Sequence, residues 1–488
     1  MNQTSLLEKI QNSFIGRDTR YPLADGTSGA RRYLDSAAST LMMKPAFDVA
    51  LNFLHHYAST HSEMHYSARG ATRAYQWAHR RILAFVGADE KKYSTYFAGS
   101  GATAGFNRIA AELAIYRPGR DVVLVSEMEH HSNDLPHRHH ANQVVHLPSL
   151  GEGQHSGGLN LDLVAEAVQK YGERINYIAV TAASNVTGVI TPVHPLAQLA
   201  HSVGAYLLVD ASQMIAHAPV SMQSQTLENA DIDILIFSGH KIYAPGSPGT
   251  VIARSELLSQ VTPVELGGGM VEDVNLHQYM PSAELPDRME AGTPNIVGAI
   301  TLAVALDILA RIGMHNIQNK EQQLITLAWN KLSAISDVKL YGPAPDTMSR
   351  TGTIAFNIKD FDHGLTAAVL NDYYNIQLRN GCFCAHPYVR EILKYELWAL
   401  NIDPNAPNAE AEVERKRGMA RASLGIYTTT ADIEALVDAV IDLVRRKQEF
   451  LALYEPEGPS GYRHCHFTPA KTDLFDPEIA LSQALDKL

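Results

Sequence analysis

Short apolar runs rich in β-branched residues recur through the first 260 residues, and longer segments with helical spacing separate them. The runs lie at residues 121–125, 177–181, 206–210, 232–237 and 250–253. Apolar runs without polar alternation are typical of strands buried on both faces of a largely parallel sheet. The segments between them are long enough for crossover connections. The pattern therefore predicts an α/β core.

The second half of the chain has a different pattern. Apolar spacing predicts a long helix over 296–312 that leaves the core. Further patterns predict helices around 321–333, 364–373 and 430–450, with Thr429 or Thr430 as N-cap of the last, and a strand at 353–358. Residues 403–417 indicate a polar excursion that ends in a charged helix, and the tail past residue 455 has no core pattern.

These patterns together predict two lobes and a tail. We expect a large α/β domain of residues 32–296, a small α+β domain of residues 1–31 and 297–454, and a C-terminal extension of residues 455–488.

Composition narrows the function classes. The chain has 488 residues, and 40 Lys plus Arg against 52 Asp plus Glu give a net charge of −12. This charge disfavours broad binding to nucleic acid or to anionic membranes. No apolar stretch approaches the roughly 18 to 20 residues of a membrane helix, and the N-terminus lacks the apolar block of a signal peptide. Three cysteines are too few for a disulfide framework, so we expect a reducing, cytoplasmic location.

Asp210 and Lys241 carry the first chemical signal. Each lies at the end of an apolar run, where ligands bind in open α/β sheets. Pyridoxal phosphate requires a lysine amine that holds its aldehyde as a Schiff base and a carboxylate against its pyridine nitrogen. A turn aspartate and a solvated loop lysine are the alternative, because short matches have a high false-positive rate.

A glycine-rich segment, residues 99–105, precedes an apolar helix expected from residue 106. Free amides and the helix dipole stabilise a phosphate at such a place, although an ordinary turn is the alternative. Thr103 adds a hydroxyl, and Ser238 and His240 beside the lysine can donate further hydrogen bonds.

Three more polar residues follow predicted strands. His130 can lie over a pyridine ring and move protons near neutral pH, or belong to a surface pair in a chain with 22 histidines. Vicinal histidines without Asp or Cys partners do not indicate a zinc site, and we expect no metal. Gln213 lies within one turn of Asp210, where its amide can bond the ring's phenolic oxygen. Asn185 suits the cofactor or a substrate carboxylate, against a turn asparagine.

Eight motifs in a fixed order carry a family resemblance: YLDSAAS (33–39), EHHSN (129–133), SNVTG (184–188), DASQ (210–213), FSGHK (237–241), EAGTPN (290–295), RNGCFCA (379–385) and RASL (421–424). The chain resembles the fold-type I, class V aminotransferase-like enzymes, in particular the cysteine desulfurase and selenocysteine lyase group. Residues 374–384 also resemble the corresponding region of molybdenum cofactor sulfurase N-terminal domains.

The resemblance implies roles for the residues around the cofactor. Lys241 would form the Schiff base, Asp210 and Gln213 would bind the ring, and His130 would stack over it. Thr103, Ser238 and His240 would bind the phosphate, whereas Ala102 stands where the family usually has a hydroxyl. Thr293 would reach the phosphate from a second subunit, which implies a homodimer.

The resemblance also implies the substrate chemistry. Arg421 would pair with the substrate α-carboxylate, as a planar two-pronged donor does. Arg379 would be a further substrate-binding residue. Cys384 would be the nucleophile that attacks substrate sulfur, and a cation such as Arg379 or His386 would favour its thiolate. A small buried hydrophobe is the alternative for this cysteine. Cys382 is expected to have no role in the reaction. The His-Cys-His sequence at 464–466 could bind a metal, but a three-residue match is weak evidence, and we expect a disordered tail there.

The leading prediction is a pyridoxal-phosphate enzyme that converts L-cysteine to L-alanine and leaves sulfur on Cys384 as a persulfide. The alternatives are a selenocysteine lyase, amino-acid epimerase or aminotransferase in which Cys384 is incidental, or a non-catalytic sulfur-relay protein. The sequence leaves open which protein accepts the sulfur.

Overall fold

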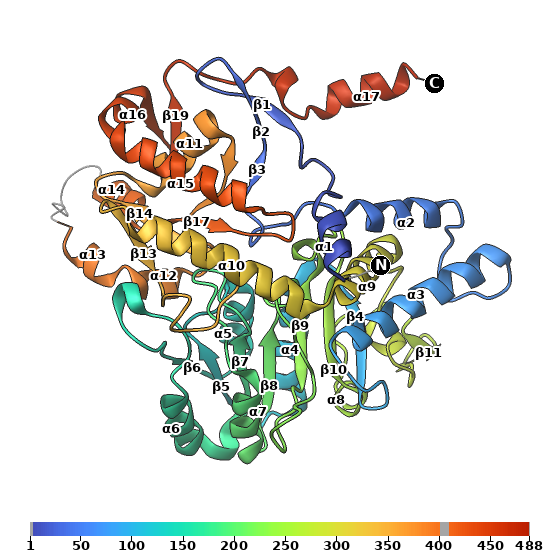
Figure 1. Ribbon diagram of the computed structural model, residues 1–488. Coiled ribbons are helices and arrows are strands. Elements are labelled where there is room, and N and C mark those ends of the chain that lie inside the picture. Colours follow the sequence, from blue (N-terminus) through green and yellow to red (C-terminus); the bar gives the residue numbers. More distant parts are fainter. Residues whose placement is uncertain (1–2, 401–408, 488) are drawn as a thin grey trace.

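The computed structural model describes residues 3–400 and 409–487. A seven-stranded sheet forms the centre of the larger part of the molecule (Figure 1). In spatial order its strands are β4 (Tyr93–Ala98), β10 (Gly249–Arg254), β9 (Ile234–Ser238), β8 (Tyr206–Asp210), β7 (Ile175–Thr181), β5 (Val122–Ser126) and β6 (Gln143–Leu147). Five strands, β6, β5, β7, β8 and β9, run parallel, whereas β10 is antiparallel to both of its neighbours. All five predicted runs form strands of this sheet, so the prediction of an α/β core is confirmed.

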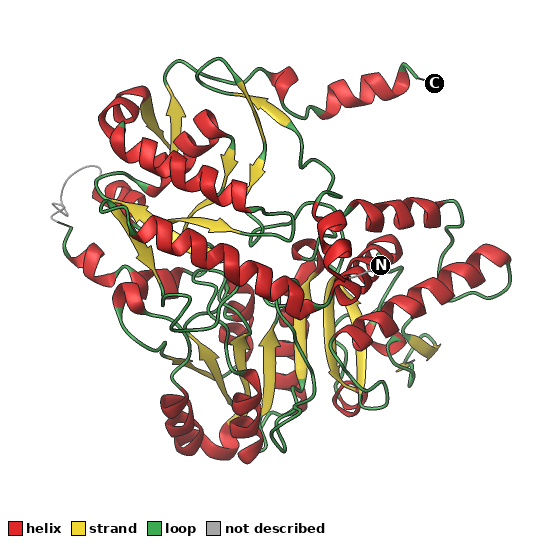
Figure 2. Cartoon of the chain, viewed as in Figure 1, coloured by secondary structure: helices red, strands yellow, loops and turns green. Residues whose placement is uncertain are grey.

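Helices cover both faces of this sheet (Figure 2). Along β8, Leu207 and Val209 pack in one apolar cluster with α3, α7 and α9, whereas Leu208 packs in a second cluster with α4 and α8. Successive side chains of a strand point to opposite faces, so this division buries the sheet on both sides. The helices of this part are α1 (Gln3–Gln11), α2 (Lys44–Leu54), α3 (Tyr66–Phe85), α4 (Gly101–Tyr116), α5 (Leu135–His140), α6 (Leu161–Tyr171), α7 (Val193–Ser202), α8 (Ser255–Gln260) and α9 (Ile296–Ile312).

The start of α4 differs from the prediction. The helix begins at Gly101 rather than at residue 106, so most of the glycine-rich segment lies inside its first turns. Gly105 allows this helix to lie close to the sheet, because a Cβ there would come within 2.7 Å of Val251 Cγ2. Tight packing, rather than a turn, is therefore the reason for this glycine.

A second, antiparallel sheet of four strands forms the smaller part of the molecule, in the order β13 (Val338–Tyr341), β14 (Thr353–Ile358), β17 (Met419–Ser423) and β16 (Arg379–Gly381). It packs against α10 (Met314–Ser333), α11 (His363–Tyr374) and α15 (Thr430–Arg445) around its own apolar cluster. Figure 1 shows α10 running from the end of α9 to this sheet. The remaining helices here are α12 (His386–Ile392), α13 (Lys394–Trp398), α14 (Ala409–Lys416) and α16 (Lys447–Leu453).

The N-terminal segment contacts both parts. Leu7, Ile10 and Phe14 pack in a cluster of the seven-stranded sheet, whereas Leu34 packs with the four-stranded sheet. The small paired strands are β1 (Arg20–Pro22) with β2 (Ser28–Ala30), β3 (Arg32–Tyr33) with β15 (Ile376–Gln377), and β11 (Val271–Val274) with β12 (Tyr279–Pro281). The division into domains at residues 31, 296 and 454 stays a prediction.

The C-terminal region departs from two expectations. Instead of one helix over 430–450, α15 ends at Arg445 and α16 begins at Lys447, while Thr429 caps α15 in a capping box with Asp432. The expected disordered tail is wrong for residues 454–464, which form a hairpin of β18 (Tyr454–Glu457) and β19 (Gly461–His464). Beyond it, α17 (Pro477–Leu485) buries no side chain and lies apart from the body in Figure 1. Residues 401–408 of the polar excursion lie outside the described residues, and α14 is its predicted charged helix.

Within the described part of the chain, no single helix has the length and apolar character to cross a membrane, although α9 and α10 pass together as a pair bent by 79°.

Candidate functional site

A polar cavity of about 340 Å³ opens at the carboxyl edge of the seven-stranded sheet. Side chains from both sheets and from the N-terminal segment line it, although they are far apart in sequence. They include the predicted residues Ala102, Thr103, His130, Asn185, Asp210, Ser238, His240, Lys241, Arg379, Cys384 and Arg421. The structure thus brings most of the predicted site residues to one cavity.

Lys241 and Asp210 enter this cavity from neighbouring parallel strands. Asp210 is the last residue of β8, and Lys241 ends the short turn that follows β9. Burial lowers the pKa of Lys241, with Asp210 acting in the opposite direction, and burial raises the pKa of Asp210, opposed by its hydrogen bond with Ser212. A lysine that loses its proton more readily is a better nucleophile toward an aldehyde.

The first turn of α4 forms one end of the cavity. The amide of Ala102 donates to Ser238 Oγ at 2.7 Å, and the hydroxyls of Thr103 and Ser132 lie 2.7 Å apart. Gly101 has a φ of +64°, and a Cβ there would lie 2.9 Å from Ser238 Oγ. This close packing leaves amides and hydroxyls facing the cavity at the positive end of a helix, a favourable place for a phosphate.

His130 follows β5 and is held as a neutral imidazole. Its Nδ1 accepts a hydrogen bond from the Ser132 amide at 3.1 Å, so a neutral ring carries its proton on Nε2. Burial, and then the charge of Lys241, lowers the pKa of His130 to about 3. Because this pKa lies below the usual range of histidine, the imidazole stays uncharged at neutral pH.

Arg421 lies on β17, in the smaller sheet, and is almost fully buried. It donates to the carbonyl oxygen of Asn185 at 2.8 Å and lies 3.3 Å from Asp35 Oδ1. Its Nε is buried without a hydrogen-bond partner among the described residues. Arg379 is exposed and lies 3.8 Å from Asp35 Oδ2. An arginine fixed at the wall of a cavity suits a carboxylate.

The two neighbouring cysteines differ in environment. Cys384 is exposed at the cavity, whereas Cys382 is buried and its Sγ donates to the carbonyl oxygen of Arg417 at 3.2 Å. Burial raises the pKa of Cys382 to about 11, which keeps this thiol protonated. Asn185 Nδ2 donates to the carbonyl oxygen of Phe383, at 2.7 Å, and so ties the Cys384 segment to the larger sheet.

Two predicted site residues do not line the cavity. Gln213 is buried, and its Nε2 donates to the carbonyl oxygen of Ala37, which does line it. Thr293 is exposed before α9. Their roles stay predictions.

In the tail, His464 accepts a hydrogen bond from the His466 amide at Nδ1, and its Nε2 lies 2.9 Å from Tyr373 Oη. Among the described residues, no group of three potential ligands is arranged to hold a metal.

Sequence reasoning assigned no role to Asp35, Ser132, Ser212 or Phe383. Asp35, Ser132, Ser212 and Phe383 all lie within the family motifs, at 33–39, 129–133, 210–213 and 379–385, so a signal for each was present. The Asp35–Arg421 contact spans 386 positions, and no local pattern reveals it.

The comparisons with known proteins agree with this geometry. Residues 32–436 match the aminotransferase class-V family. The chain belongs to this family. The cysteine desulfurase of Pectobacterium atrosepticum is 33% identical over 412 residues, which cover 83% of this chain and 91% of that protein. A cysteine desulfurase of Escherichia coli O6:H1 is also 33% identical, over 408 residues and the same shares of the two chains.

Solved structures of cysteine desulfurases have the same fold. The cysteine desulfurase of Thermococcus onnurineus superposes with a TM-score of 0.73 at 27% identity and covers 85% of this chain and 94% of that one. CsdA, a cysteine desulfurase of Escherichia coli, gives 0.72 at 28% identity and covers 91% and 99%. The expected fold-type I architecture and class V enzyme family are confirmed, and the local resemblance to molybdenum cofactor sulfurases stays a prediction.

Proposed function

We propose that this class V enzyme is a cysteine desulfurase that binds pyridoxal phosphate, converts L-cysteine to L-alanine and holds the sulfur on Cys384 as a persulfide. One observation carries the proposal: the exposed thiol of Cys384 reaches the same cavity as the Lys241–Asp210 pair and Arg421. The names of the relatives, cysteine desulfurases at 33% identity, support the choice of substrate.

The residues of the cavity fit pyridoxal phosphate. Lys241 would hold its aldehyde, buried Asp210 would pair with its ring nitrogen, and the start of α4 together with Ser238 would bind its phosphate. The volume of about 340 Å³ is within the range of small-molecule sites. When bound, this cofactor withdraws electrons and so acidifies the Cα–H of an amino acid.

The chain's own residues then have distinct tasks. Arg421 orients the substrate through its carboxylate. The Lys241 amine, with its lowered pKa, takes up and returns the Cα proton. The neutral His130 presents its Nε2–H as a donor. The Cys384 thiolate attacks the substrate sulfur, forming the S–S bond as the Cβ–S bond breaks and alanine retains the carbon skeleton.

Intact-protein mass spectrometry tests this proposal. After treatment with L-cysteine, the cofactor-loaded chain should gain one sulfur atom per subunit, and peptide mapping should locate it on the peptide containing Cys384. Alanine should appear in equal amount. If the chain gains no sulfur but converts cysteine to another product, or racemises it, the proposal is wrong and one of the alternative reactions takes its place.

We also propose a homodimer. Large apolar side chains are exposed along α2 and in the hairpin of β11 and β12, including Leu51, Leu54, Leu276 and Met280. Apolar surface of this kind favours association. Thr293, exposed and outside the cavity of its own subunit, is free to reach the cavity of a second copy. Light scattering of the purified chain should give twice the mass of one subunit.

We also propose a cytoplasmic location and a partner protein that accepts sulfur. Cys382, Cys384 and Cys465 are all free thiols, which supports a cytoplasmic location. A protein that accepts the sulfur from Cys384 completes the proposed cycle, because the persulfide must be discharged before the next turnover.

A further inference from the structure

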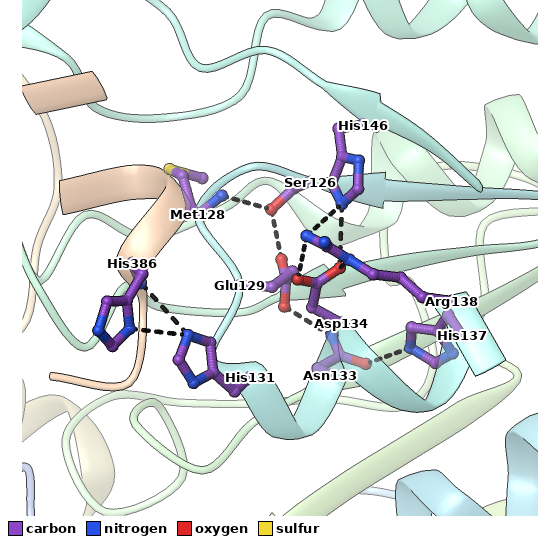
Figure 3. Close-up of polar contacts among 10 residues, drawn as sticks. All are labelled: Ser126, Met128, Glu129, His131, Asn133, Asp134, His137, Arg138, His146 and His386. Carbon is purple, nitrogen blue, oxygen red and sulfur yellow. Dashed lines mark hydrogen bonds and ion pairs between the residues drawn. The ribbon is translucent and has the colours of Figure 1, made fainter. Parts of the chain in front are cut away.

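A pair of histidines joins the segment that carries His130 to the segment that carries Cys384. His386 Nδ1 lies 3.1 Å from His131 Nε2, and the two rings stack with centroids 4.8 Å apart (Figure 3). The amide of His386 also donates to His131 Nε2, at 3.4 Å. In the other direction, the amide of His131 donates to the carbonyl oxygen of Cys384 at 2.8 Å. The ring and the backbone of His131 therefore both hold the Cys384 segment.

The held segment has an unfavourable backbone. Phe383 and Cys384 both have a φ of +53°, a left-handed conformation that residues with a Cβ rarely adopt. Two such residues in succession persist only where the surroundings enforce them. Contacts from outside the segment include those of His131, the hydrogen bond from Asn185 to Phe383, and the guanidinium of Arg421, which lies 4.6 Å from the centre of the Phe383 ring.

The His131 end of this contact is rigid. The neighbouring Glu129 is buried, and its carboxylate accepts hydrogen bonds from the Thr181 amide at 2.7 Å, from Asn133 Nδ2 at 2.6 Å and from Ser126 Oγ. Figure 3 shows the contacts of Glu129 with Ser126 and Asn133 beside the loop that leads to His131. The contact therefore positions Cys384 against a fixed support.

The contact requires a neutral His131. A backbone amide only donates, so His131 Nε2 must accept and can carry no proton. The titratable groups that face His131 are His130, His386, Asp134 and Arg138, and the last two form an ion pair of 2.6 Å that also includes His146. Burial, followed by the proximity of His386, lowers the pKa of His131. The acceptor is present above that pKa and is lost as the pH falls through it.

We propose that His131 is a positioning residue for Cys384: its Nε2 and amide hold residues 382–386 in the strained conformation that keeps the thiol at the cavity. This inference rests on the proposed function, in which Cys384 is the nucleophile. His131 itself does not line the cavity, so its effect acts through the Cys384 segment.

The test compares His131→Ala with His131→Gln in the cofactor-loaded chain. Glutamine supplies an acceptor that does not titrate, so it should retain most of the activity, whereas alanine formation by His131→Ala should fall about tenfold, the effect of roughly one net hydrogen bond. His139→Ala is the matched control, because His139 is exposed on α5. The cofactor absorbance should be the same in all variants.

Hydrogen exchange supplies a readout that does not depend on activity. The amides of residues 382–386 should exchange faster in His131→Ala than in the original chain, and His131→Gln should restore their protection. In the Cys384→Ala background, substituting His131 should not alter the remaining exchange of the substrate Cα–H. At acid pH the original chain should lose activity through a step that His131→Gln lacks.

Two results would overturn the proposal: unchanged exchange and turnover in His131→Ala, or a His131→Gln variant as impaired as His131→Ala. Failure of the proposed function is distinguishable, because it leaves the original chain without sulfur on Cys384 while the exchange data still report the state of the segment.

Discussion

The guanidinium of Arg421 lies 3.3 Å from the carboxylate of Asp35, a residue that comes 386 positions earlier in the chain. The contact joins the N-terminal segment to the smaller sheet at the wall of the cavity. Burial raises the pKa of Asp35 and lowers that of Arg421 to about 10, so both groups lose hydration to reach this position. A substrate carboxylate in the cavity would give this buried cation a second anionic partner.

Replacing Arg421 should therefore weaken binding of the substrate carboxylate. We expect Arg421→Lys to raise KM for cysteine roughly tenfold or more, because hydrogen bonds to charged groups contribute about 1.5–3 kcal/mol. Arg445→Lys is the control and should leave KM unchanged, since Arg445 is exposed on α15 and lies outside the cavity. Steady-state kinetics with cysteine, and binding of cysteamine, which lacks the carboxylate, provide the measurement. Equal losses for both ligands would contradict a carboxylate role.

The two cysteines at 382 and 384 should respond differently to substitution. Cys384→Ala should abolish alanine formation from cysteine and retain the visible cofactor band, because only the nucleophile is lost. Cys382→Ala should keep turnover within a few-fold, since a thiol with a pKa of about 11 supplies little thiolate. Alanine assays and absorbance spectra of both variants decide the matter. Full turnover in Cys384→Ala would defeat the assignment of the nucleophile.

Lys241 should be the lysine that carries the cofactor. Borohydride reduction of the loaded chain, followed by peptide mapping, should label the peptide of Lys241, and Lys241→Ala should remove the label. Lys320 is a suitable control, because burial also lowers its pKa, to about 8, but it lies outside the cavity and donates to the carbonyl oxygen of Ile426. We expect Lys320→Met to keep the label. If another lysine carries the label, that lysine and not Lys241 forms the Schiff base with the cofactor.

His137 should make stability depend on pH. It is fully buried between Tyr177 and Asn133, and burial lowers its pKa to about 3 from 6.5. Between these values the unfolded chain binds a proton that the folded chain does not, so stability falls as the pH falls below 6.5. At pH 5 the cost is about 2 kcal/mol for one such histidine.

The measurement is thermal unfolding of the original chain and His137→Gln between pH 7 and 4.5. The variant is expected to be less stable at pH 7, where it loses hydrogen bonds, but to show a shallower decline toward acid pH. Parallel curves would mean that His137 titrates normally in the folded chain.

Strand composition determined much of the larger sheet. Five apolar runs rich in β-branched residues had no polar alternation, and a sheet covered on both faces is the arrangement that buries them. β4 and β6 were missed because their polar positions, such as Ser94 and His146, interrupt the apolar pattern. The hairpin at 454–464 was missed because only two of its residues, Tyr454 and His464, are buried, and both are amphipathic.

The candidate site divides in the same way. The motifs around Asp210 and Lys241 are contiguous and follow strands, so local sequence was enough to place them at one sheet edge. The contacts of Arg421 with Asp35 and of His131 with Cys384 join segments hundreds of positions apart. No periodicity records such contacts. The first arises where the N-terminal segment pairs with β17 of the smaller sheet, and the second where the smaller part of the molecule packs against the larger one.

By itself, the sequence determined the α/β core, the family motifs and the residues suited to hold an aldehyde cofactor, because each of these depends on local composition and spacing. The tertiary structure alone decided which residues share the cavity, that Cys384 is exposed while Cys382 is buried, and that two left-handed residues are held in place by a distant histidine. These features depend on burial and on contacts between distant segments, which exist only once the two sheets have packed together.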